Sequence, residues 1–286
     1  MRKDRIKEVF AGRKLIIATK HRKEQVISPV LNKALHVECL HDATLDTDSL
    51  GTFTGEVERL DDVLETARKK CRMAMQLSNC DMAVASEGSF GAHPTLGFMN
   101  ADDELLLFMD AKNELEVVVR ELSVKTNFNG QKIKTETELI DFADRAKFPS
   151  HGLILRKSAT SHSEIVKGIT ELSVLKDVFY DFVIRFGEVY IETDMRAMYN
   201  PTRMEVIESA AKKLADKIVS FCPQCFTPGF GVTNVKAGLP CMSCGFPTRS
   251  TLFHEYRCIK CHYTEDRKYP NGKKTEEPTF CDICNP

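Results

Sequence analysis

Apolar positions along the first two thirds of the chain follow two different periods. Short runs that are apolar at nearly every position predict buried strands, and runs with one apolar face every 3.6 residues predict helices. Strands are predicted at 13–19, 81–86, 104–111, 114–122, 151–156 and 188–193. Helices are predicted at 24–35, 60–77, 170–186 and 201–221, and a further one begins with the capping-box pattern after Thr135.

The order of these elements predicts the fold class. Helices that alternate with short buried strands indicate an α/β domain with a mixed, largely parallel sheet flanked by helices. The strands at 104–111 and 114–122 are separated by a Lys-Asn turn and are therefore expected to be antiparallel. Pro29 is expected to shorten or kink its helix, and Asp46 and Asp48 have the residue types of a turn.

The composition changes near residue 218. Beyond this point the chain is rich in Cys, Gly and Pro and has no long apolar run. We therefore predict two domains: an α/β ligand-binding or catalytic domain at 1–218, and a small domain held together by metal at 219–286.

Eight of the eleven cysteines lie after residue 221, in four Cys-x-x-Cys pairs. Two such pairs supply the tetrahedral thiolate shell that zinc prefers, so two structural zinc ions in a double zinc ribbon are predicted. The predicted ligands are Cys222, Cys225, Cys241, Cys244, Cys258, Cys261, Cys281 and Cys284. Sequential pairing, first pair with second and third with fourth, fits the usual spacing. A nested pairing, second with third and first with fourth, stays open.

The net charge of the chain argues against nucleic acid and anionic membranes as partners. The net charge is −1, from 40 Lys and Arg against 41 Asp and Glu, which gives no overall attraction to nucleic acid or to an anionic membrane. The ribbon has only a small basic excess, and two tetrathiolate zinc sites would make it net negative. The apolar run at 15–18 is too short for a signal-peptide core or a membrane span, so a cytoplasmic protein is expected.

Polar residues concentrate at three junctions that follow predicted strands. The carboxyl ends of parallel strands share one edge of a sheet, where ligands bind, so we expect these residues to converge. The junctions at 19–23, 86–94 and 192–203 contain the candidates Lys20, Lys23, Glu87, Ser89, His93, Glu192, Asp194, Arg196, Asn200 and Arg203.

The third junction has the clearest chemistry. Asn200 and Pro201 have the residue types of an N-cap and a first helical residue. Arg203 would lie in the first helical turn, where the helix dipole disfavours a cation unless an anion binds there. Glu192 and Asp194 beside this helix start would suit a Mg²⁺ ion that bridges to phosphate oxygens. The alternative is a buried ion-pair network that only fixes a long loop.

Three strings of the sequence resemble a known family. ASEGSFGAHP at 85–94, ETDMRAMYNPTRMEVI at 192–207 and the closing CDICNP are similar to an uncharacterised bacterial family described only as a domain of unknown function. More distantly, LIIAT at 15–19 followed by Lys23, and AVASEG at 83–88, resemble the inosine/xanthosine triphosphate pyrophosphatases. That second resemblance implies that Glu87 binds metal and that Lys20 or Lys23 contacts phosphate.

These patterns together predict a Mg²⁺-dependent hydrolase that acts on a nucleotide or another phosphorylated small molecule. Glu87, Glu192 and Asp194 would hold the metal or activate water, and the other candidates would bind the substrate. The alternative is a binding or adaptor protein without catalysis, in which the zinc ribbon contacts a protein or nucleic-acid partner. The oligomeric state is not predicted.

Overall fold

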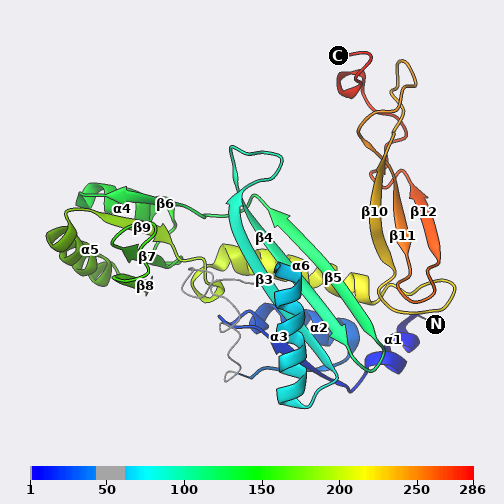
Figure 1. Cartoon of the computed structure of the whole chain (residues 1–286), viewed down its shortest axis with the longest axis horizontal. Coiled ribbons are helices and arrows are strands. Elements are labelled where there is room, and N and C mark those ends of the chain that lie inside the picture. The colour runs from blue at the N-terminus through cyan, green and yellow to red at the C-terminus, as the bar shows by residue number, and fades with distance from the viewer. Residues whose placement is uncertain (1, 43–61) are drawn as a thin grey trace. The chain divides into compact units, whose positions relative to one another are not determined.

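The computed structural model describes residues 2–42 and 62–286 of the chain (Figure 1). Asp46, Asp48 and the first two positions of the helix predicted at 60–77 lie outside these ranges. The chain divides into two compact units, Met1–Ala215 and Asp216–Pro286. Among the helices that the structure describes, none is both long and apolar enough to cross a bilayer.

The first unit begins with a five-stranded sheet in the order β2-β1-β3-β4-β5. β1 (Lys14–Ala18) pairs in parallel with β2 (Glu38–Leu40) and with β3 (Met82–Ala92). β3, β4 (Asn100–Asp110) and β5 (Leu115–Ser123) are antiparallel neighbours. The sheet is therefore mixed, as predicted, but the prediction that it is largely parallel is wrong. The loops after β3 and β4 are short enough for hairpins, whereas a parallel neighbour needs a long crossover.

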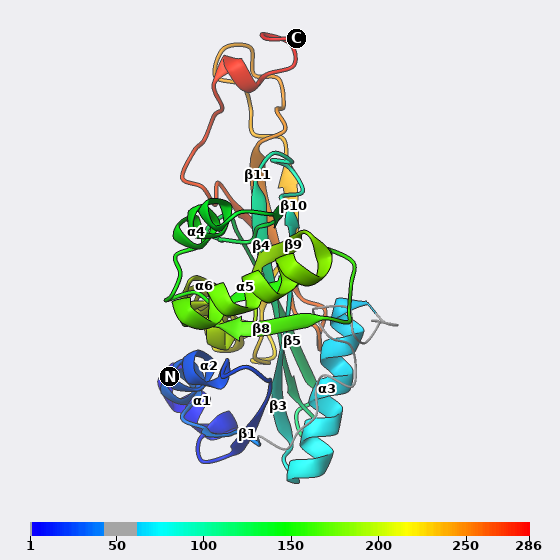
Figure 2. The same ribbon diagram turned by 90° about the vertical axis from the view of Figure 1, so that its left-hand side faces the viewer.

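Helices cover both faces of this sheet. α2 (Glu24–Leu35) joins β1 to β2, and α3 (Val63–Ser78) precedes β3. α1 (Arg2–Phe10) and α2 lie on one side of the sheet and α3 on the other (Figure 2). From β1 the chain first forms β2 on one side of β1 and later β3 on the other side. The place between β1 and β3, where the direction of winding reverses, is the switch point of the sheet. In open α/β sheets, ligands bind at such a point beyond the carboxyl ends of the strands.

A second, antiparallel sheet follows in the order β6-β9-β7-β8. Its strands are β6 (Gly130–Ile133), β7 (Leu153–Arg156), β8 (Ile165–Ile169) and β9 (Val189–Thr193). Helices α4 (Glu136–Arg145) and α5 (Leu172–Phe186) bury their apolar faces against it, with Phe142, Phe179 and Val189 in the shared core. The capping box predicted at the start of α4 is confirmed, since the Thr135 and Glu138 side chains each bond to the other's backbone N–H. α6 (Pro201–Ile218) comes next.

The second unit is built on a three-stranded antiparallel meander. Its strands are β10 (Gly231–Ala237), β11 (Thr251–Arg257) and β12 (Thr264–Lys268). Apolar packing in this unit is sparse. Phe230 stacks on Tyr256 and Tyr263, with ring centroids 5.6 and 5.9 Å apart. Such a small core leaves much of the stability of the unit to its cysteine sites.

Several predicted elements differ from the observed ones. α2 has the predicted bounds and continues through Pro29. The strand predicted at 81–86 is wrong in length because β3 extends to Ala92, so Glu87 and Ser89 lie within a strand and not in a loop. α1, β2, β6 and β8 were not predicted, because they are short or mostly polar.

Candidate functional sites

Two groups of four cysteines come together in the second unit. We name Cys222, Cys225, Cys258 and Cys261 the first cysteine site, and Cys241, Cys244, Cys281 and Cys284 the second cysteine site. Within each group the Sγ atoms lie within 4.8 Å of one another, and four Sγ pairs that join different Cys-x-x-Cys units are 3.5 to 3.9 Å apart. A tetrahedral zinc ion with Zn–S bonds of about 2.3 Å needs an S–S separation of about 3.8 Å. Both sites could therefore bind zinc.

Both pairings that the sequence left open are wrong. The first Cys-x-x-Cys pair joins the third, and the second joins the fourth. The meander explains this crossing: β10 separates the first pair from the second, β11 the second from the third, and β12 the third from the fourth. Each antiparallel strand carries the chain to the opposite end of the sheet, so alternate pairs meet.

The first unit contains a buried cluster at the switch point of its first sheet. We name Lys23, Ser86, Asp102, Glu104 and Arg203 the switch-point cluster. In the antiparallel register Gly88 is opposite Glu104 and Phe90 is opposite Asp102, which places these residues and Ser86 on one face of the sheet. No member of the cluster is more than 6% exposed. Its charged groups must therefore be compensated within the protein.

Lys23 reaches the cluster from the residue before α2. β1 pairs with β3 only as far as Ala18 and Ala85, and Lys23 approaches β3 just beyond this point. Its Nζ donates to the Ser86 Oγ at 3.2 Å and lies 4.0 Å from Glu104 Oε2. Burial, followed by the charge of Arg203, lowers the pKa of Lys23 to about 8.

Arg203 reaches the same carboxylate from the first turn of α6. Its Nε donates to Glu104 Oε1 at 2.6 Å, and its Nη1 donates to the Met195 carbonyl. The guanidinium also lies 4.9 Å from the centre of the Phe90 ring. Gly88 makes room for this arrangement, because a Cβ there would overlap the guanidinium and lie 2.5 Å from Glu104 Oε1.

Asp102 is the exceptional member of the cluster. It is 1% exposed, and neither of its carboxyl oxygens has a hydrogen-bond partner among the residues that the structure describes. Burial, followed by the charge of Glu104, raises the pKa of Asp102 to about 8. The two carboxyl groups on this strand face therefore have different environments: Glu104 is ion-paired with Arg203, whereas the pKa of Asp102 is raised toward neutral pH. A buried carboxyl group with a raised pKa is typical of acid–base sites.

Glu87 lies on the other face of β3. Its side chain is turned toward α3, where Lys70 Nζ lies 2.5 Å from Glu87 Oε1 and both side chains are at most 8% exposed. The strand therefore separates Glu87 from Arg203. Ser89 shares the face of Glu87 and is exposed.

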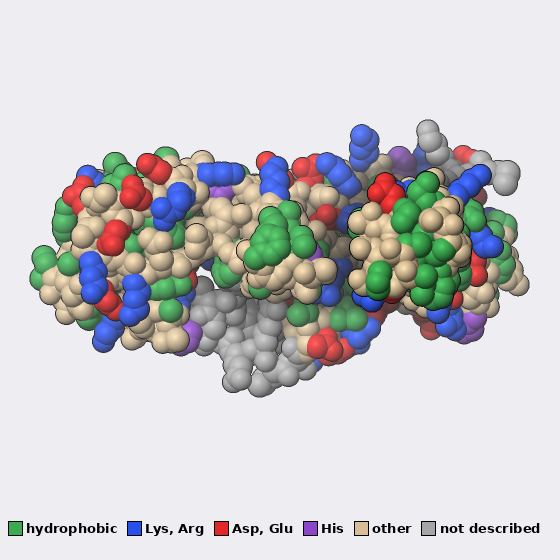
Figure 3. Space-filling model, turned by 90° about the horizontal axis from the view of Figure 1, so that it is seen from above, with side chains coloured by type: hydrophobic (Ala, Val, Ile, Leu, Met, Phe, Trp, Pro, Cys, Tyr) green, Lys and Arg blue, Asp and Glu red, His purple; other side chains and the backbone are tan. Residues whose placement is uncertain are grey.

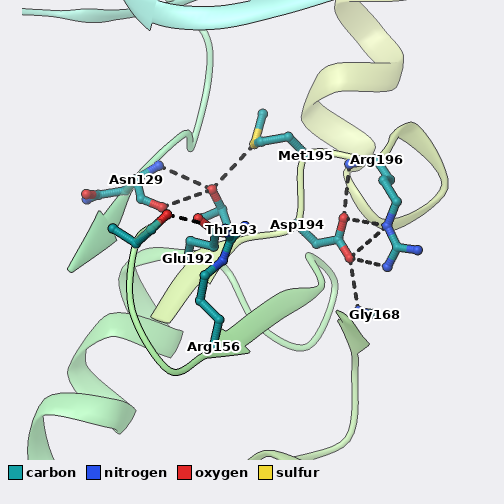
Figure 4. Close-up of polar contacts among 9 residues, drawn as sticks. Asn129, Arg156, Gly168, Glu192, Thr193, Asp194, Met195 and Arg196 are labelled. Atoms are coloured by element: carbon teal, nitrogen blue, oxygen red, sulfur yellow. Dashed lines mark hydrogen bonds and ion pairs between the residues drawn. The ribbon is translucent and has the colours of Figure 1, made fainter. Parts of the chain in front are cut away.

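Three candidates of the third junction, Glu192, Asp194 and Arg196, line a cavity at the second sheet. The cavity has a volume of about 320 Å³, and its lining includes Arg156, Glu192, Asp194 and Arg196 together with His162, Phe128 and Ile154. The Arg156 guanidinium is ion-paired with Glu192 (Figure 4). Burial raises the pKa of Glu192, and the charge of Arg156 opposes this. We name the cavity with this lining the Arg156 cavity.

The carboxylate of Asp194 is hydrogen-bonded to other groups of the protein. It accepts hydrogen bonds from the backbone N–H of Gly168 and of Arg196, both at 3.0 Å, and from Arg196 Nη2 at 2.6 Å (Figure 4). The Arg196 guanidinium also lies 4.6 Å from the Tyr199 ring centre. These contacts favour a positioning role for Asp194, which holds Arg196 at the cavity wall.

Three further candidates have local roles in the structure. The Asn200 side chain accepts the Arg203 N–H at 3.0 Å, which confirms the predicted N-cap of α6. The His93 Nδ1 accepts the N–H groups of Thr95 and Leu96 in the turn after β3. Lys20 is half-buried in the loop before α2.

The structure thus divides the predicted residues between two places. Lys23 and Arg203 meet at the switch point, and Glu192, Asp194 and Arg196 meet at the Arg156 cavity. Asp102 and Glu104 were not among the predicted residues, although the acidic run at 102–104 directly before the apolar run at 105–109 was a usable signal. Arg156 was also missed, at the end of a fully buried strand.

The fold and its sites define the class: an α/β protein with a C-terminal unit that carries two tetracysteine sites able to bind zinc. The chain belongs to the family described as Domain of unknown function (DUF6671), whose model matches residues 70–286. No curated protein matches the chain.

Proposed function

We propose that this protein is a hydrolase that acts on a phosphorylated small molecule, such as a nucleotide, at the switch-point cluster. One observation carries the proposal: Lys23 and Arg203, from the starts of two helices, meet on Glu104 at the switch point of a doubly wound sheet. The starts of α2 and α6 contribute partial positive charge, which adds to the attraction for phosphate.

The cluster supplies the groups that phosphate chemistry needs. Lys23 and Arg203 would exchange their contact with Glu104 for contacts with phosphate oxygens, and so neutralise charge in the transition state. Asp102, with its raised pKa, would transfer the proton to or from water or the leaving group. We thus assign to Asp102 the role of activating water that we first expected for Glu87, Glu192 and Asp194.

Magnesium has no prepared site in this arrangement. Across residues 2–42 and 62–286, the only groups of three or more His, Cys, Asp or Glu side chains that could close on one ion are the two cysteine sites. Glu87 is paired with Lys70, and Glu104 is paired with Arg203. Both carboxylates are thus engaged by cations of the protein, and we derive no step through a Mg²⁺ ion.

The resemblance to the inosine/xanthosine triphosphate pyrophosphatases is compatible with this site. Lys23 follows the first strand and precedes a helix, and it contacts β3, the strand that contains Glu87. This order is the one on which the resemblance depends. It makes a phosphoanhydride the first bond to test.

The experiment is an assay of phosphate and pyrophosphate release from nucleoside mono-, di- and triphosphates, with and without Mg²⁺. Lys23→Met and Asp102→Asn should each lower kcat/KM by about 100-fold or more, because each removes one charge or proton-transfer group. Lys33→Met, at an exposed position of α2, the helix that Lys23 precedes, is the matched control and should keep full activity. Turnover that survives Lys23→Met and Asp102→Asn would exclude this site.

Protein binding by the ribbon is a second candidate. Four apolar side chains around the second cysteine site are 45 to 63% exposed: Met242, Phe246, Phe280 and Ile283. Figure 3 shows hydrophobic side chains gathered on the end of the ribbon that faces the viewer, at the right of the view. Exposed apolar groups of this kind favour a protein partner over nucleic acid. Met242→Ser with Phe280→Ser should abolish capture of such a partner and leave the zinc content unchanged.

A further inference from the structure

We propose that the Arg156 cavity binds a free α-amino acid with an apolar side chain. The inference does not depend on the function proposed for the switch-point cluster. It rests on the charges that line the cavity, on one buried donor without a partner, and on the size of the cavity.

The charges of the lining are balanced. Arg156 and Arg196 contribute two positive charges, and Glu192 and Asp194 contribute two negative charges. A dianion such as phosphate would disturb this balance in a partly buried site, where uncompensated charge is costly. A zwitterion preserves the balance, because it adds one charge of each sign.

Arg156 has a donor available for a carboxylate. Its side chain is 6% exposed, and its buried Nε has no hydrogen-bond partner within the described part of the chain. Its Nη1 and Nη2 already donate to the Ala159 carbonyl and to Glu192. A ligand carboxylate at Nε would satisfy the remaining donor, and Arg196, held in place by Asp194, can supply a second contact.

Glu192 is placed to receive the ammonium group. It is 22% exposed, so it is reachable from the cavity, and Arg156 is its ion-pair partner. A ligand ammonium would compensate Glu192 when the ligand carboxylate engages Arg156. The two charges of an α-amino acid lie close together, as do Arg156 and Glu192 across the neighbouring strands β7 and β9 (Figure 4).

The volume of the cavity and the apolar part of its wall limit the size and the side-chain type of the ligand. The volume of about 320 Å³ is near the lower end of the range for ligand cavities, which suits a molecule of amino-acid size better than a whole nucleotide. Phe128, Ile154 and Met195 supply the apolar part of the wall. They would contact the side chain of the ligand, so an apolar amino acid is favoured over a charged one.

The test is isothermal titration of the full-length, zinc-loaded protein with the twenty amino acids, with L-leucine as the first probe. N-acetyl-leucine lacks the ammonium group, leucinamide lacks the carboxylate, and inorganic phosphate tests for a simple anion site. At least one apolar amino acid should bind, and loss of either charge should weaken binding about tenfold or more. If no amino acid binds at about 10 mM, or if phosphate or N-acetyl-leucine binds as tightly, the proposal is overturned.

Variants locate the binding. Glu192→Gln keeps the shape of the side chain and should weaken amino-acid binding about tenfold or more. Glu188→Gln, which alters a carboxylate paired with Lys132 and Lys134 outside the cavity, is the matched control and should bind as the unmodified protein does. Equal affinity of the Glu192→Gln and unmodified proteins would remove the cavity from the interaction.

Discussion

Arg203 Nε donates to Glu104 Oε1 at 2.6 Å, although 99 residues separate the two in sequence. The bond joins the first turn of α6 to the middle of β4, and both side chains are at most 5% exposed. Because Lys23 also approaches Glu104, this one carboxylate lies close to both cations of the switch-point cluster.

Removal of one partner of the pair should be strongly destabilising. Arg203→Met leaves Glu104 buried with much less compensation, and we expect the free energy of unfolding of the first unit to fall by about 3–5 kcal/mol. Urea denaturation measures the change. The control is Lys212→Met, which breaks an exposed pair with Glu208 on the same helix and should cost less than about 1 kcal/mol. A loss as small for Arg203→Met as for this control would contradict the buried pair.

Gly88→Ala tests the close approach of Arg203 and Glu104 to β3. The new methyl group would overlap the Arg203 guanidinium, so we expect a loss of about 1–3 kcal/mol from displaced side chains. Gly91→Ala, three residues further along the same strand, meets nothing within 4 Å and should be nearly neutral. Thermal unfolding of the two variants side by side provides the measurement. Equal melting temperatures would show that the approach is looser than described.

Asp102 should make stability depend on pH. Its folded pKa of about 8 lies above the ordinary value of about 3.9, so the folded state holds this proton more tightly than the unfolded state does. The stabilising contribution is complete below about pH 4 and is lost as the pH rises toward 8. Asp102→Asn should therefore have nearly the stability of the unmodified protein at pH 4, and should gain on it as the pH rises to 8. Denaturation curves at several pH values measure the difference, and a constant difference would refute the prediction.

Zinc stoichiometry tests the crossed pairing of the cysteines. Cys222→Ser with Cys258→Ser alters only the first cysteine site and should reduce the zinc content from two ions to one. Cys222→Ser with Cys241→Ser alters both sites and should reduce it toward zero. Sequential pairing predicts the reverse result for these two double variants. Elemental analysis of the purified proteins decides between them.

Much of the local structure could be read from the sequence. The bounds of α2, the capping box of α4 and the Asn200 cap of α6 depend on residues within one or two helical turns, so the sequence pattern contains the information. The eight cysteines of the two cysteine sites were found for the same reason, since each Cys-x-x-Cys pair is a local unit.

The remaining features depend on contacts between distant segments. The direction of β4 and β5, the separation of β9 into a second sheet and the crossed cysteine pairs follow from which strands become neighbours. Asp102 and Glu104 flank Asp103 in an acidic run, and only the tertiary structure buries them, pairs Glu104 with Arg203 and raises the pKa of Asp102. The sequence by itself determined most of the helices, two of their caps and the cysteines of the two candidate zinc sites, because these depend on short-range geometry. The tertiary structure alone decided the strand order, the cysteine pairing and the switch-point cluster, because burial and charge compensation arise between residues far apart in the chain.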